Sequence, residues 1–362
     1  MVRLRIDLGY DGFSFNGWAA QPGMRTVQGE VEAALERVLC GVRSADVAHA
    51  DGRTPLPHLV VAGRTDAGVH AAHQVCHLDV TEAQLARCVG HMDATPVQAL
   101  ELRLQRMMPG DIAIHRVSVA PEGFDARFSA LERTYVYRIC DDPAAWDPRQ
   151  QSYVWLTDQR LDESVMNEAA ACAIGLHDFG SFAIANPGGT TIRDVKTAYW
   201  SRVPARPLIA DPRGERYRTP AMESGLLCFT IVADAFARNM VRSLVNGCVQ
   251  VGLGKRTVDW FAEKIATPLR EGSTGPIAPE GLTLEHIEIS GGWRACRTRR
   301  EDPCAPHAAR ATCRISRWMA CTAHAQSRWI CGRPRNPFHI STSLGVDGSF
   351  RDDSLQSSGP IF

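Results

Sequence analysis

The stretch VAGRTDAGVHA, residues 61–71, places four polar side chains among glycines and alanines, between two runs of different character. The apolar run LPHLVV precedes it, and the run HQVCHLDV that follows alternates as a half-buried strand does. Gly63 and Gly68 permit positive φ angles and close backbone approach, and the alanines keep the surroundings small. The pattern therefore predicts a tight loop beside a strand, with room for a bulky molecule against the carboxylate of Asp66.

Asp66 is the residue of this loop with the clearest chemical use. A carboxylate flanked by small residues can act as a nucleophile or a general base toward a molecule that lies against it. Arg64 can contact a phosphate, or fill the gap left by a displaced base. Composition alone favours a plainer interpretation, in which Asp66 caps a turn and pairs with Arg64, because aspartate is a common turn residue.

Three histidines, His70, His73 and His77, raise the question of a metal site. Spacings of three and four residues bring side chains to one face of a helix, whereas neighbours on a strand alternate between faces. Because this segment alternates as a strand, His70 and His73 should face opposite sides, and metal binding is disfavoured. The twelve cysteines show no usual zinc-ligand spacing, and we expect them to be mostly free thiols.

In the rest of the chain, apolar residues alternate in some segments, which predicts strands, and recur every three to four residues in others, which predicts helices. Thr26 and Asp162 are expected to cap helices, and Gly254 in VGLGKRT suits a helix C-terminus better than a phosphate loop, whose spacing it lacks. We expect strands at residues 2–10, 111–120, 133–140, 225–236 and 282–290, a strand ending at Val80, and helices at residues 27–38, 82–89, 163–175, 238–252 and 257–267.

This order of elements predicts an α+β fold with two similar halves and a mainly antiparallel sheet. We place an N-terminal half at residues 1–140 and a C-terminal half at 141–290, with the boundary in the Pro- and Asp-rich run CDDPAAWDPRQQ. Residues 291–362 form an atypical tail that is rich in Arg and Cys. It is either a basic RNA-binding tail or a disordered extension, and its low aliphatic content favours disorder.

Composition sets broad limits on the class of protein. The chain has 362 residues, of which 44% are hydrophobic, and a formal net charge of zero. The tail holds 11 Arg against 5 Asp and Glu, so the first 290 residues carry about six net negative charges, and any RNA contact there needs a local basic patch. No apolar run reaches the roughly 18 residues that span a bilayer. We expect no membrane partner, no signal peptide and a cytoplasmic location.

Two further pairs of side chains are candidates for a site. Tyr135 and Tyr137 share one face of the strand at residues 133–140, where aromatic residues are usually core. An exposed tyrosine can instead stack on a nucleobase. Arg238 and Arg242 are four residues apart in a predicted helix, which suits either a solvated face or an arginine that pairs with a buried carboxylate or a phosphate.

Together these motifs resemble the tRNA pseudouridine synthase A family, from near the N-terminus to about residue 290. The blocks that carry the resemblance are YDGFSFNGW, QPGMRTVQGEVEAAL, AGRTDAGVHA, MMPGDI, FDARFSALERTYVYRI, GLHDFGSF, MVRSLVNGCVQVGLGK and GPIAPEGLTL. The loop with Asp66 is highly specific, and the other seven blocks stand in the family's order. The resemblance implies a pseudouridine synthase fold, with two α+β halves and an extended sheet around a central cleft.

The resemblance also implies an activity. Such enzymes isomerise uridine to pseudouridine in the anticodon stem-loop of many tRNAs, at tRNA positions 38, 39 and 40. They need no cofactor or metal, and they usually act as homodimers that bind tRNA. The expected partners of this chain are therefore a tRNA and a second copy of itself.

Residue by residue, Asp66 matches the catalytic aspartate, which helps to break the N-glycosidic bond by attack or by elimination. Arg242 matches the basic residue that pairs with it and keeps it ionised. Tyr135 matches the tyrosine that stacks on the target base, and Arg64 the arginine that holds the target nucleotide out of the stack. Leu282 matches an apolar residue of the uracil pocket.

The chain departs from the family at several places, none of which is Asp66, Tyr135 or Arg242. GWAA stands where relatives often have GWQ, the insertions at residues 43–57 and 203–224 are long, and the tail has no counterpart. Two other functions remain open: a non-catalytic tRNA-binding protein or RNA chaperone on the same fold, and an N-glycosidase that releases free base.

Overall fold

The alternation of the first ten residues builds the first strand of the sheet. In the computed structural model β1 spans Val2–Tyr10, with Leu4, Ile6 and Leu8 fully buried on one face. The structure describes residues 1–40, 57–184, 189–205, 223–269 and 275–290. The tail and most of both insertions lie outside the described residues, and so do the interpretations that depend on them.

The described strands form one ten-stranded sheet with the order β4-β1-β3-β10-β5-β9-β8-β7, to which β2 adds beside β3 and β6 beside β5. All pairs are antiparallel except β10 with β3 and β5 with β6. This confirms the predicted α+β class with a mostly antiparallel sheet. The strands after β1 are β2 (Val60–Val61), β3 (His70–Val80), β4 (Ile112–Val119), β5 (Ala130–Cys140), β6 (Trp155–Leu156), β7 (Gly175–Asp178), β8 (Ile192–Arg202), β9 (Leu227–Ala233) and β10 (Leu282–Ile289).

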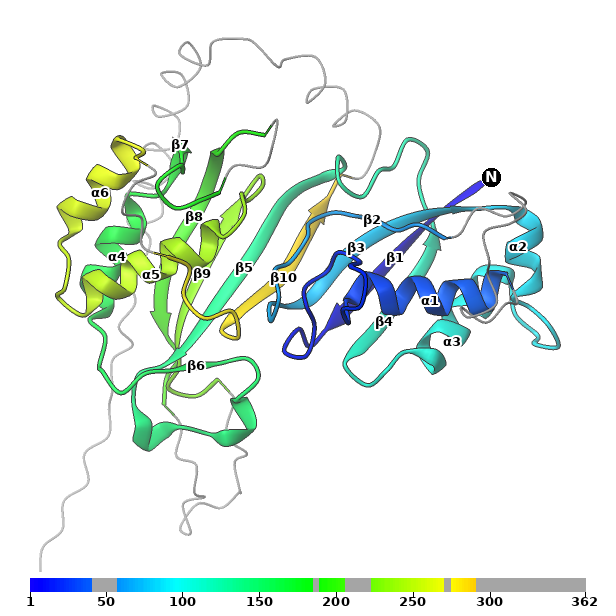
Figure 1. Cartoon of the computed structure of the whole chain (residues 1–362), viewed down its shortest axis with the longest axis horizontal. Coiled ribbons are helices and arrows are strands. Elements are labelled where there is room, and N and C mark those ends of the chain that lie inside the picture. Colours follow the sequence, from blue (N-terminus) through cyan, green and yellow to red (C-terminus); the bar gives the residue numbers. More distant parts are fainter. Residues whose placement is uncertain (41–56, 185–188, 206–222, 270–274, 291–362) are drawn as a thin grey trace, which may run out of the picture. The chain divides into compact units, whose positions relative to one another are not determined.

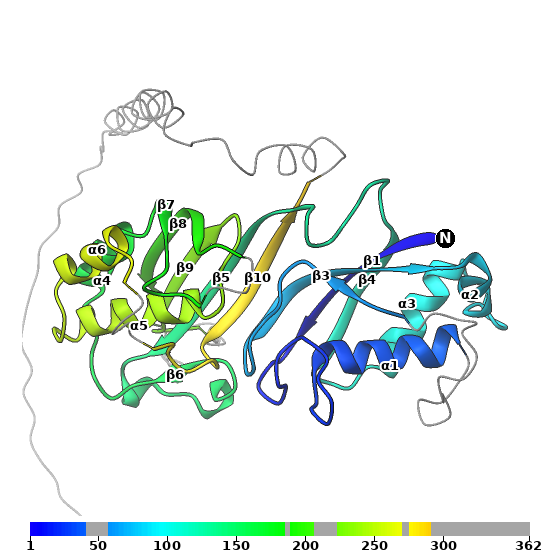
Figure 2. The ribbon, with the colours of Figure 1, turned by 45° about the horizontal axis from the view of Figure 1, so that its top comes forward.

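Helices gather in two groups along the sheet (Figure 1). The first group packs near β1 and β4, and the second lies beside β7, β8 and β9 (Figure 2). None of the helices in the described ranges combines the length and apolarity needed to cross a bilayer. The helices are α1 (Val27–Leu39), α2 (Glu82–Arg87), α3 (Pro96–Met107), α4 (Glu163–Ala171), α5 (Met240–Gly252) and α6 (Val258–Ala266), with 3₁₀ turns at Pro143–Ala145 and Pro148–Gln150.

The predicted helix ends are confirmed by their hydrogen bonds. The side chain of Thr26 accepts from the backbone N–H of Gly29, and Asp162 accepts from the first turn of α4. After α5, Gly254 has a φ of +67°, and the N–H of Lys255 donates to the carbonyl of Gln250. That pattern is the usual glycine-terminated helix end, and it accounts for VGLGKRT without a phosphate loop.

Several features differ from the sequence prediction, and three of them concern the longer elements. Helix α5 begins at Met240 and not at residue 238, because Asn239 has a left-handed φ of 63°. Arg238 therefore precedes the helix and does not share a helical face with Arg242. Helix α3 was not expected, although its Thr95 capping box and N-terminal Pro96 are visible signals. Strand β8 was also missed, because a bulge between Val195 and Thr197 interrupts its alternation.

At the centre of the sheet, the last described strand, β10, lies between β3 and β5. Strand β10 pairs with β3 on one side, through Thr283 opposite His70, and with β5 on the other, through Leu282 opposite Tyr137. Strand β5 precedes the predicted boundary at residue 140, and it pairs with β9 from beyond that boundary. The two-half division stays a prediction, drawn across a sheet that is itself continuous.

Candidate active site

The loop that contains Asp66 connects β2 to β3 and is held by the segment after β1. The N–H of Trp18 donates to the carbonyl of Thr65 over 3.1 Å, and the hydroxyls of Tyr10 and Thr65 lie 2.8 Å apart. Gly68 has a φ of +77°, and a Cβ there would lie 2.7 Å from Cγ of Pro279. Only glycine therefore fits this position, which fixes the turn just after Asp66.

Two buried side chains hold the other end of the loop. The amide of Gln74 donates to the carbonyl of Gly63 over 2.7 Å, and the guanidinium of Arg133 donates to the carbonyl of Ala62 over 2.6 Å. A Cβ at Gly63 would lie 3.4 Å from Nε of Arg133. That is an ordinary van der Waals distance, and Gly63 does not adopt a positive φ, so neither property predicted for this glycine is required here. Bonded at both ends, the loop is a rigid support for Asp66.

Asp66 is paired with Arg242, which stands in the first turn of α5. Nη1 of Arg242 lies 3.9 Å from Oδ2 of Asp66, and its Nε donates to the carbonyl of Ile277 over 2.6 Å. The Asp66 side chain is 36% exposed and that of Arg242 only 14%. Within the described residues Asp66 has this ion pair and none with Arg64. The arginine is thus positioned by a backbone carbonyl, while the carboxylate stays accessible to a molecule that enters the cleft.

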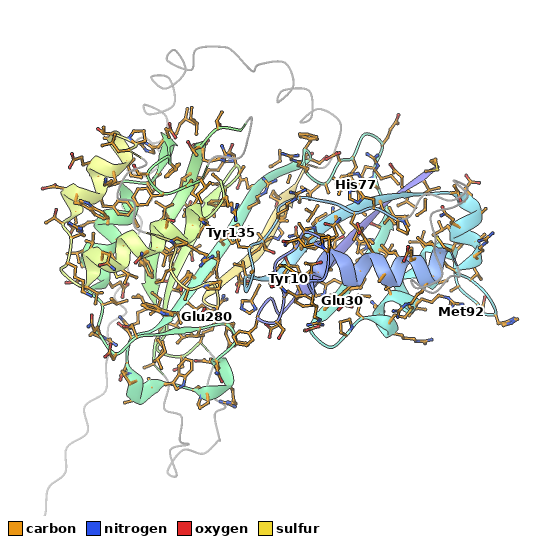
Figure 3. All side chains as sticks on the ribbon, viewed as in Figure 1. Tyr10, Glu30, His77, Met92, Tyr135 and Glu280 are labelled. Atoms are coloured by element: carbon orange, nitrogen blue, oxygen red, sulfur yellow. The ribbon has the colours of Figure 1, made fainter. Side chains whose placement is uncertain are left out.

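Asp66 and Arg242 line a cleft of about 510 Å³. Tyr135 also lines it, buried on β5 and edge-on to the ring of Phe236, with ring centres 5.1 Å apart. Tyr135 and Tyr10, on β1, both lie toward the middle of the sheet (Figure 3). Burial raises the pKa of Tyr135 above its ordinary value, so its phenol is protonated near neutral pH. Leu282, at the start of β10, adds an apolar wall.

The charge of the cleft is strongly one-sided. Among the described residues that line it, Asp66 is the one acidic side chain and six are arginines. Arg64, Arg127 and Arg238 are exposed, and the guanidinium of Arg127 lies 5.6 Å from the ring centre of Phe128. Six cations against one carboxylate attract a polyanion, although the whole chain is neutral. The six arginines are Arg64, Arg127, Arg133, Arg193, Arg238 and Arg242.

The predicted site residues therefore surround one cleft. Asp66, Arg64, Tyr135, Arg242 and Leu282 all line it, though they come from distant parts of the sequence. What each of them does there stays a prediction. The plainer interpretation of Arg238 and Arg242 as a solvated helix face is wrong for Arg242, whose side chain is mostly buried.

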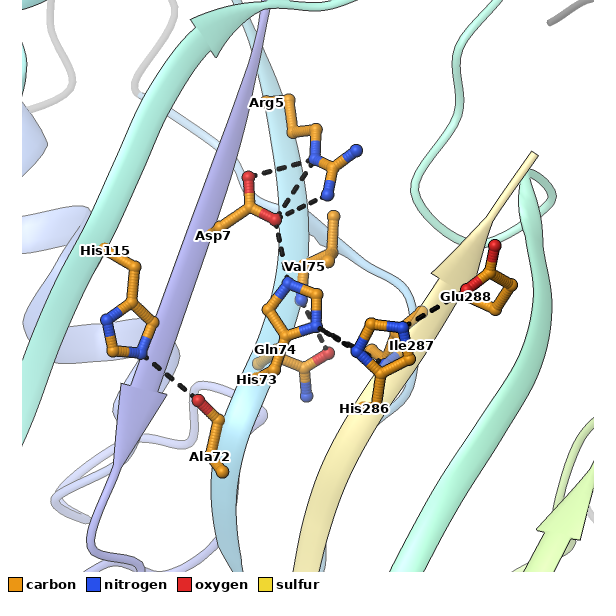
Figure 4. A network of polar contacts seen from close by, with 10 residues as sticks. All are labelled: Arg5, Asp7, Ala72, His73, Gln74, Val75, His115, His286, Ile287 and Glu288. Carbon is orange, nitrogen blue, oxygen red and sulfur yellow. Dashed lines mark hydrogen bonds and ion pairs between the residues drawn. The ribbon is translucent and has the colours of Figure 1, made fainter. Parts of the chain in front are cut away.

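The three histidines next to the loop have separate partners. Nδ1 of His70 accepts from the N–H of Gly12 over 3.0 Å, and burial lowers the pKa of His70. His77 accepts from the N–H of Ala126. His73 bonds Asp7 over 2.9 Å and stacks on His286 in a polar chain across β1, β3 and β10 (Figure 4). In the part of the chain that the structure describes, no three His, Cys, Asp or Glu side chains are grouped to hold a metal.

Comparison with known proteins agrees with this geometry. The family model described as tRNA pseudouridine synthase matches residues 169–288. The chain is 70% identical over 287 residues to the tRNA pseudouridine synthase A of Bifidobacterium animalis subsp. lactis, which covers 79% of this chain and 93% of the relative. The chain belongs to the tRNA pseudouridine synthase A family.

More distant members of the family align over the same share of the chain. The enzyme of that name from Bifidobacterium longum is 61% identical over 289 residues, or 79% of this chain and 93% of the relative. The one from Streptomyces griseus subsp. griseus is 41% identical over 286 residues, or 79% of this chain and 87% of the relative. The resemblance inferred from the eight sequence blocks is thus confirmed.

Phe236, Arg133 and Arg193 are among the cleft residues that were missed from sequence. Phe236 falls at the end of the strand predicted over residues 225–236, but it lies in the loop after β9, and its ring contact with Tyr135 is a long-range one. Arg133 lies in the recognised ERTYVYR block, but its bond to the carbonyl of Ala62 is a long-range contact. Arg193 is the second residue of β8, the strand that was missed because a bulge interrupts its alternation. The sequence therefore offered no signal for Arg193 beyond the presence of an arginine in a segment with no predicted element.

Proposed function

We propose that this protein isomerises uridine to pseudouridine in tRNA and that Asp66 is its catalytic carboxylate. The observation that carries the proposal is the pair of Asp66 and Arg242 in an arginine-lined cleft, with the carboxylate open and the arginine buried. Membership in the tRNA pseudouridine synthase A family supports the same reaction. The alternative of a non-catalytic RNA-binding protein gives no reason to keep an open, paired carboxylate in the cleft.

The reaction breaks the N1–C1′ bond of uridine and forms a C5–C1′ bond within the same nucleotide. N1 gains a proton and C5 loses one, so atoms and electrons balance without an oxidant or reductant. Asp66 promotes cleavage of the first bond, either by attack on the nucleotide or by elimination at the sugar. Arg242, 3.9 Å away, pairs with the Asp66 carboxylate and stabilises the charge that shifts as the bond breaks.

The remaining lining residues have roles in holding the base. Tyr135, protonated and packed against Phe236, offers its ring for stacking on the detached uracil. Leu282 closes the apolar side of that pocket. Arg64, exposed at the mouth of the cleft, takes the place of the flipped nucleotide in the RNA stack.

The finer expectations belong to the same proposal. The substrate positions are 38, 39 and 40 in the anticodon stem-loop, the assembly is a homodimer, and the compartment is the cytoplasm. The basic cleft supports an RNA stem-loop as substrate, because phosphate contacts provide most of the sequence-independent affinity for RNA.

The decisive experiment converts an unmodified tRNA transcript with the wild-type protein and with Asp66→Ala. We expect Asp66→Ala to lose at least about a thousandfold in rate. Asp79→Ala is the matched control, because Asp79 also pairs with an arginine and is 41% exposed, but lies outside the cleft. Pseudouridine is measured by mapping the modified positions in the RNA.

Three outcomes would contradict the proposal. Full activity of Asp66→Ala would remove its catalytic role. Tight tRNA binding by the wild-type protein without any pseudouridine would indicate an RNA-binding protein or chaperone. Release of free uracil would indicate an N-glycosidase.

A further inference from the structure

The geometry points to Arg193 as a phosphate-binding residue of the cleft, one that holds a backbone phosphate next to the nucleotide presented to Asp66. This inference rests on the proposed function, since it takes RNA as the molecule in the cleft. It adds a contact from β8, which is separated in the sheet from β3, the strand after the Asp66 loop, by β10, β5 and β9. Neither the sequence blocks nor the family resemblance assigns a role to this arginine.

Arg193 reaches the cleft from the second position of β8. Its Nε is buried and has no hydrogen-bond partner among the described residues. Its Nη1 donates to the carbonyl of Ile192 and lies 3.4 Å from the hydroxyl of Thr190, both close neighbours in the chain. Nη2 also has no bond to another described residue, so the guanidinium of this cleft-lining arginine keeps unused donors.

No carboxylate in the described part of the chain forms an ion pair with Arg193. Asp234 is the acidic side chain that acts on it, and its Oδ1 accepts from the backbone N–H groups of Asp194 and Ala235 instead. Burial lowers the pKa of Arg193, and Asp234 offsets only part of that effect. An arginine that is desolvated and lacks an anion is costly unless a ligand supplies one.

The other cleft arginines differ from Arg193. Arg133 and Arg242 donate to backbone carbonyls, and Arg242 also pairs with Asp66. Arg64 and Arg238 are exposed, so a phosphate that binds there only replaces water around the guanidinium and contributes little to the affinity. Arg193 has already lost part of its hydration on folding. A phosphate, whose oxygens match the planar fork of a guanidinium, therefore gains most at Arg193.

The first test measures binding of an anticodon stem-loop RNA over a series of salt concentrations, in an Asp66→Ala background that keeps the RNA unmodified. We expect Arg193→Gln to weaken binding roughly tenfold to a hundredfold. The slope of log Kd against log salt should fall by about 0.7 to 0.9, as for the loss of one phosphate contact. Arg193→Lys should keep most of that slope but recover only part of the affinity, because lysine lacks the fork.

Arg106→Gln is the matched control. Arg106 is an exposed arginine near the end of α3 and outside the cleft, so the same charge is removed without a cleft contact. We expect its salt slope to equal that of the parent protein. Thermal unfolding of each variant checks that the fold is retained.

The second test replaces, one at a time, the phosphates on the 5′ and 3′ sides of the target uridine with neutral methylphosphonates. For one of the two RNAs, the parent protein should lose affinity while Arg193→Gln loses no more, so that the two changes are not additive. If Arg193→Gln fails to fold, Arg193→Lys is compared with the parent protein on the two modified RNAs in its place.

The inference is overturned by an unchanged Kd in Arg193→Gln, by weaker binding with an unchanged salt slope, or by neutral phosphates that cost the parent protein nothing. These results concern binding alone. A wild-type protein that binds the stem-loop through Arg193 but forms no pseudouridine would refute the proposed function and leave the phosphate contact standing.

Discussion

Asp66 and Asp141 both face arginines, but in surroundings that suit opposite purposes. Asp141 follows β5, its side chain is fully buried, and Arg202 holds both of its oxygens at 2.7 and 2.9 Å. The N–H of Leu161 adds a third bond at 3.1 Å. Asp66 is 36% exposed and lies 3.9 Å from its arginine, beyond hydrogen-bond distance.

The difference separates an ion pair that holds the fold from one that is available for chemistry. Asp141 ties the end of β5 to the end of β8 and to the residues before α4, with its lone pairs already used. Asp66 keeps its oxygens available, and its partner Arg242 is oriented by the carbonyl of Ile277 rather than by the carboxylate itself. Three experiments test this distinction, in addition to those on Asp66 and Arg193.

The largest effect is expected on stability, from Asp141→Ala. Removing the buried partner leaves Arg202 with only its longer ion pair to Glu163, at 3.9 Å, and should cost about 3–5 kcal/mol in the free energy of unfolding. Asp66→Ala, at a half-open position, should cost less than about 1 kcal/mol. Urea unfolding of both variants measures the contrast, and equal losses would contradict it.

A smaller effect, on activity rather than on folding, is expected from Arg242→Gln. Without Arg242 the Asp66 carboxylate loses its paired cation, which stabilises the charge that shifts during the reaction, and the rate of pseudouridine formation should fall roughly tenfold to a hundredfold. The free energy of unfolding should change much less than in Asp141→Ala. Single-turnover rates on a tRNA transcript, with thermal unfolding alongside, check both parts. A variant with wild-type rates would remove Arg242 from the mechanism.

The smallest effect concerns stability in acid. Burial alone would raise the pKa of Asp141, but Arg202, the N–H of Leu161 and Arg160 hold it below the ordinary value of 3.8. A depressed pKa stabilises the fold at pH values above about 4, and that stability is lost as the pH falls through the lower, folded-state pKa. Asp141→Asn should therefore show a shallower fall of the free energy of unfolding below about pH 4.

The free energy of unfolding of Asp141→Asn should still fall in acid, because other carboxylates contribute to this fall. Burial raises the pKa of Asp7, but its bonds to His73 and Arg5 bring that pKa below its ordinary value. Arg3 likewise lowers the pKa of Asp79. Urea unfolding at pH values from 6 down to 2 gives the measurement. An acid slope in Asp141→Asn equal to that of the wild type would show that Asp141 contributes nothing to it.

Much of the local structure could be predicted from the sequence, because its signals are local. Alternation placed β1, and the caps Thr26 and Asp162 placed α1 and α4. Prediction failed where a local irregularity broke the period. The left-handed Asn239 moved the start of α5, and the bulge after Val195 hid β8.

The candidate site was predicted only as far as its motifs reach. The loop around Asp66 was recognisable by its small residues and by the seven other blocks, and composition alone favoured a pair with Arg64. The actual pair joins residues 66 and 242, and no period in the sequence relates positions so distant. Strand β10 beside β3 and α5 beside the loop decide that pairing.

The sequence by itself determined most of the elements, the family and the identity of Asp66 as the residue to test. The tertiary structure decided which arginines meet that carboxylate, which bond the backbone, and which, like Arg193, have a buried donor with no acceptor. The physical reason is that periodicity and capping act within a few residues, whereas desolvation and ion pairing depend on side chains that only the folded sheet brings together.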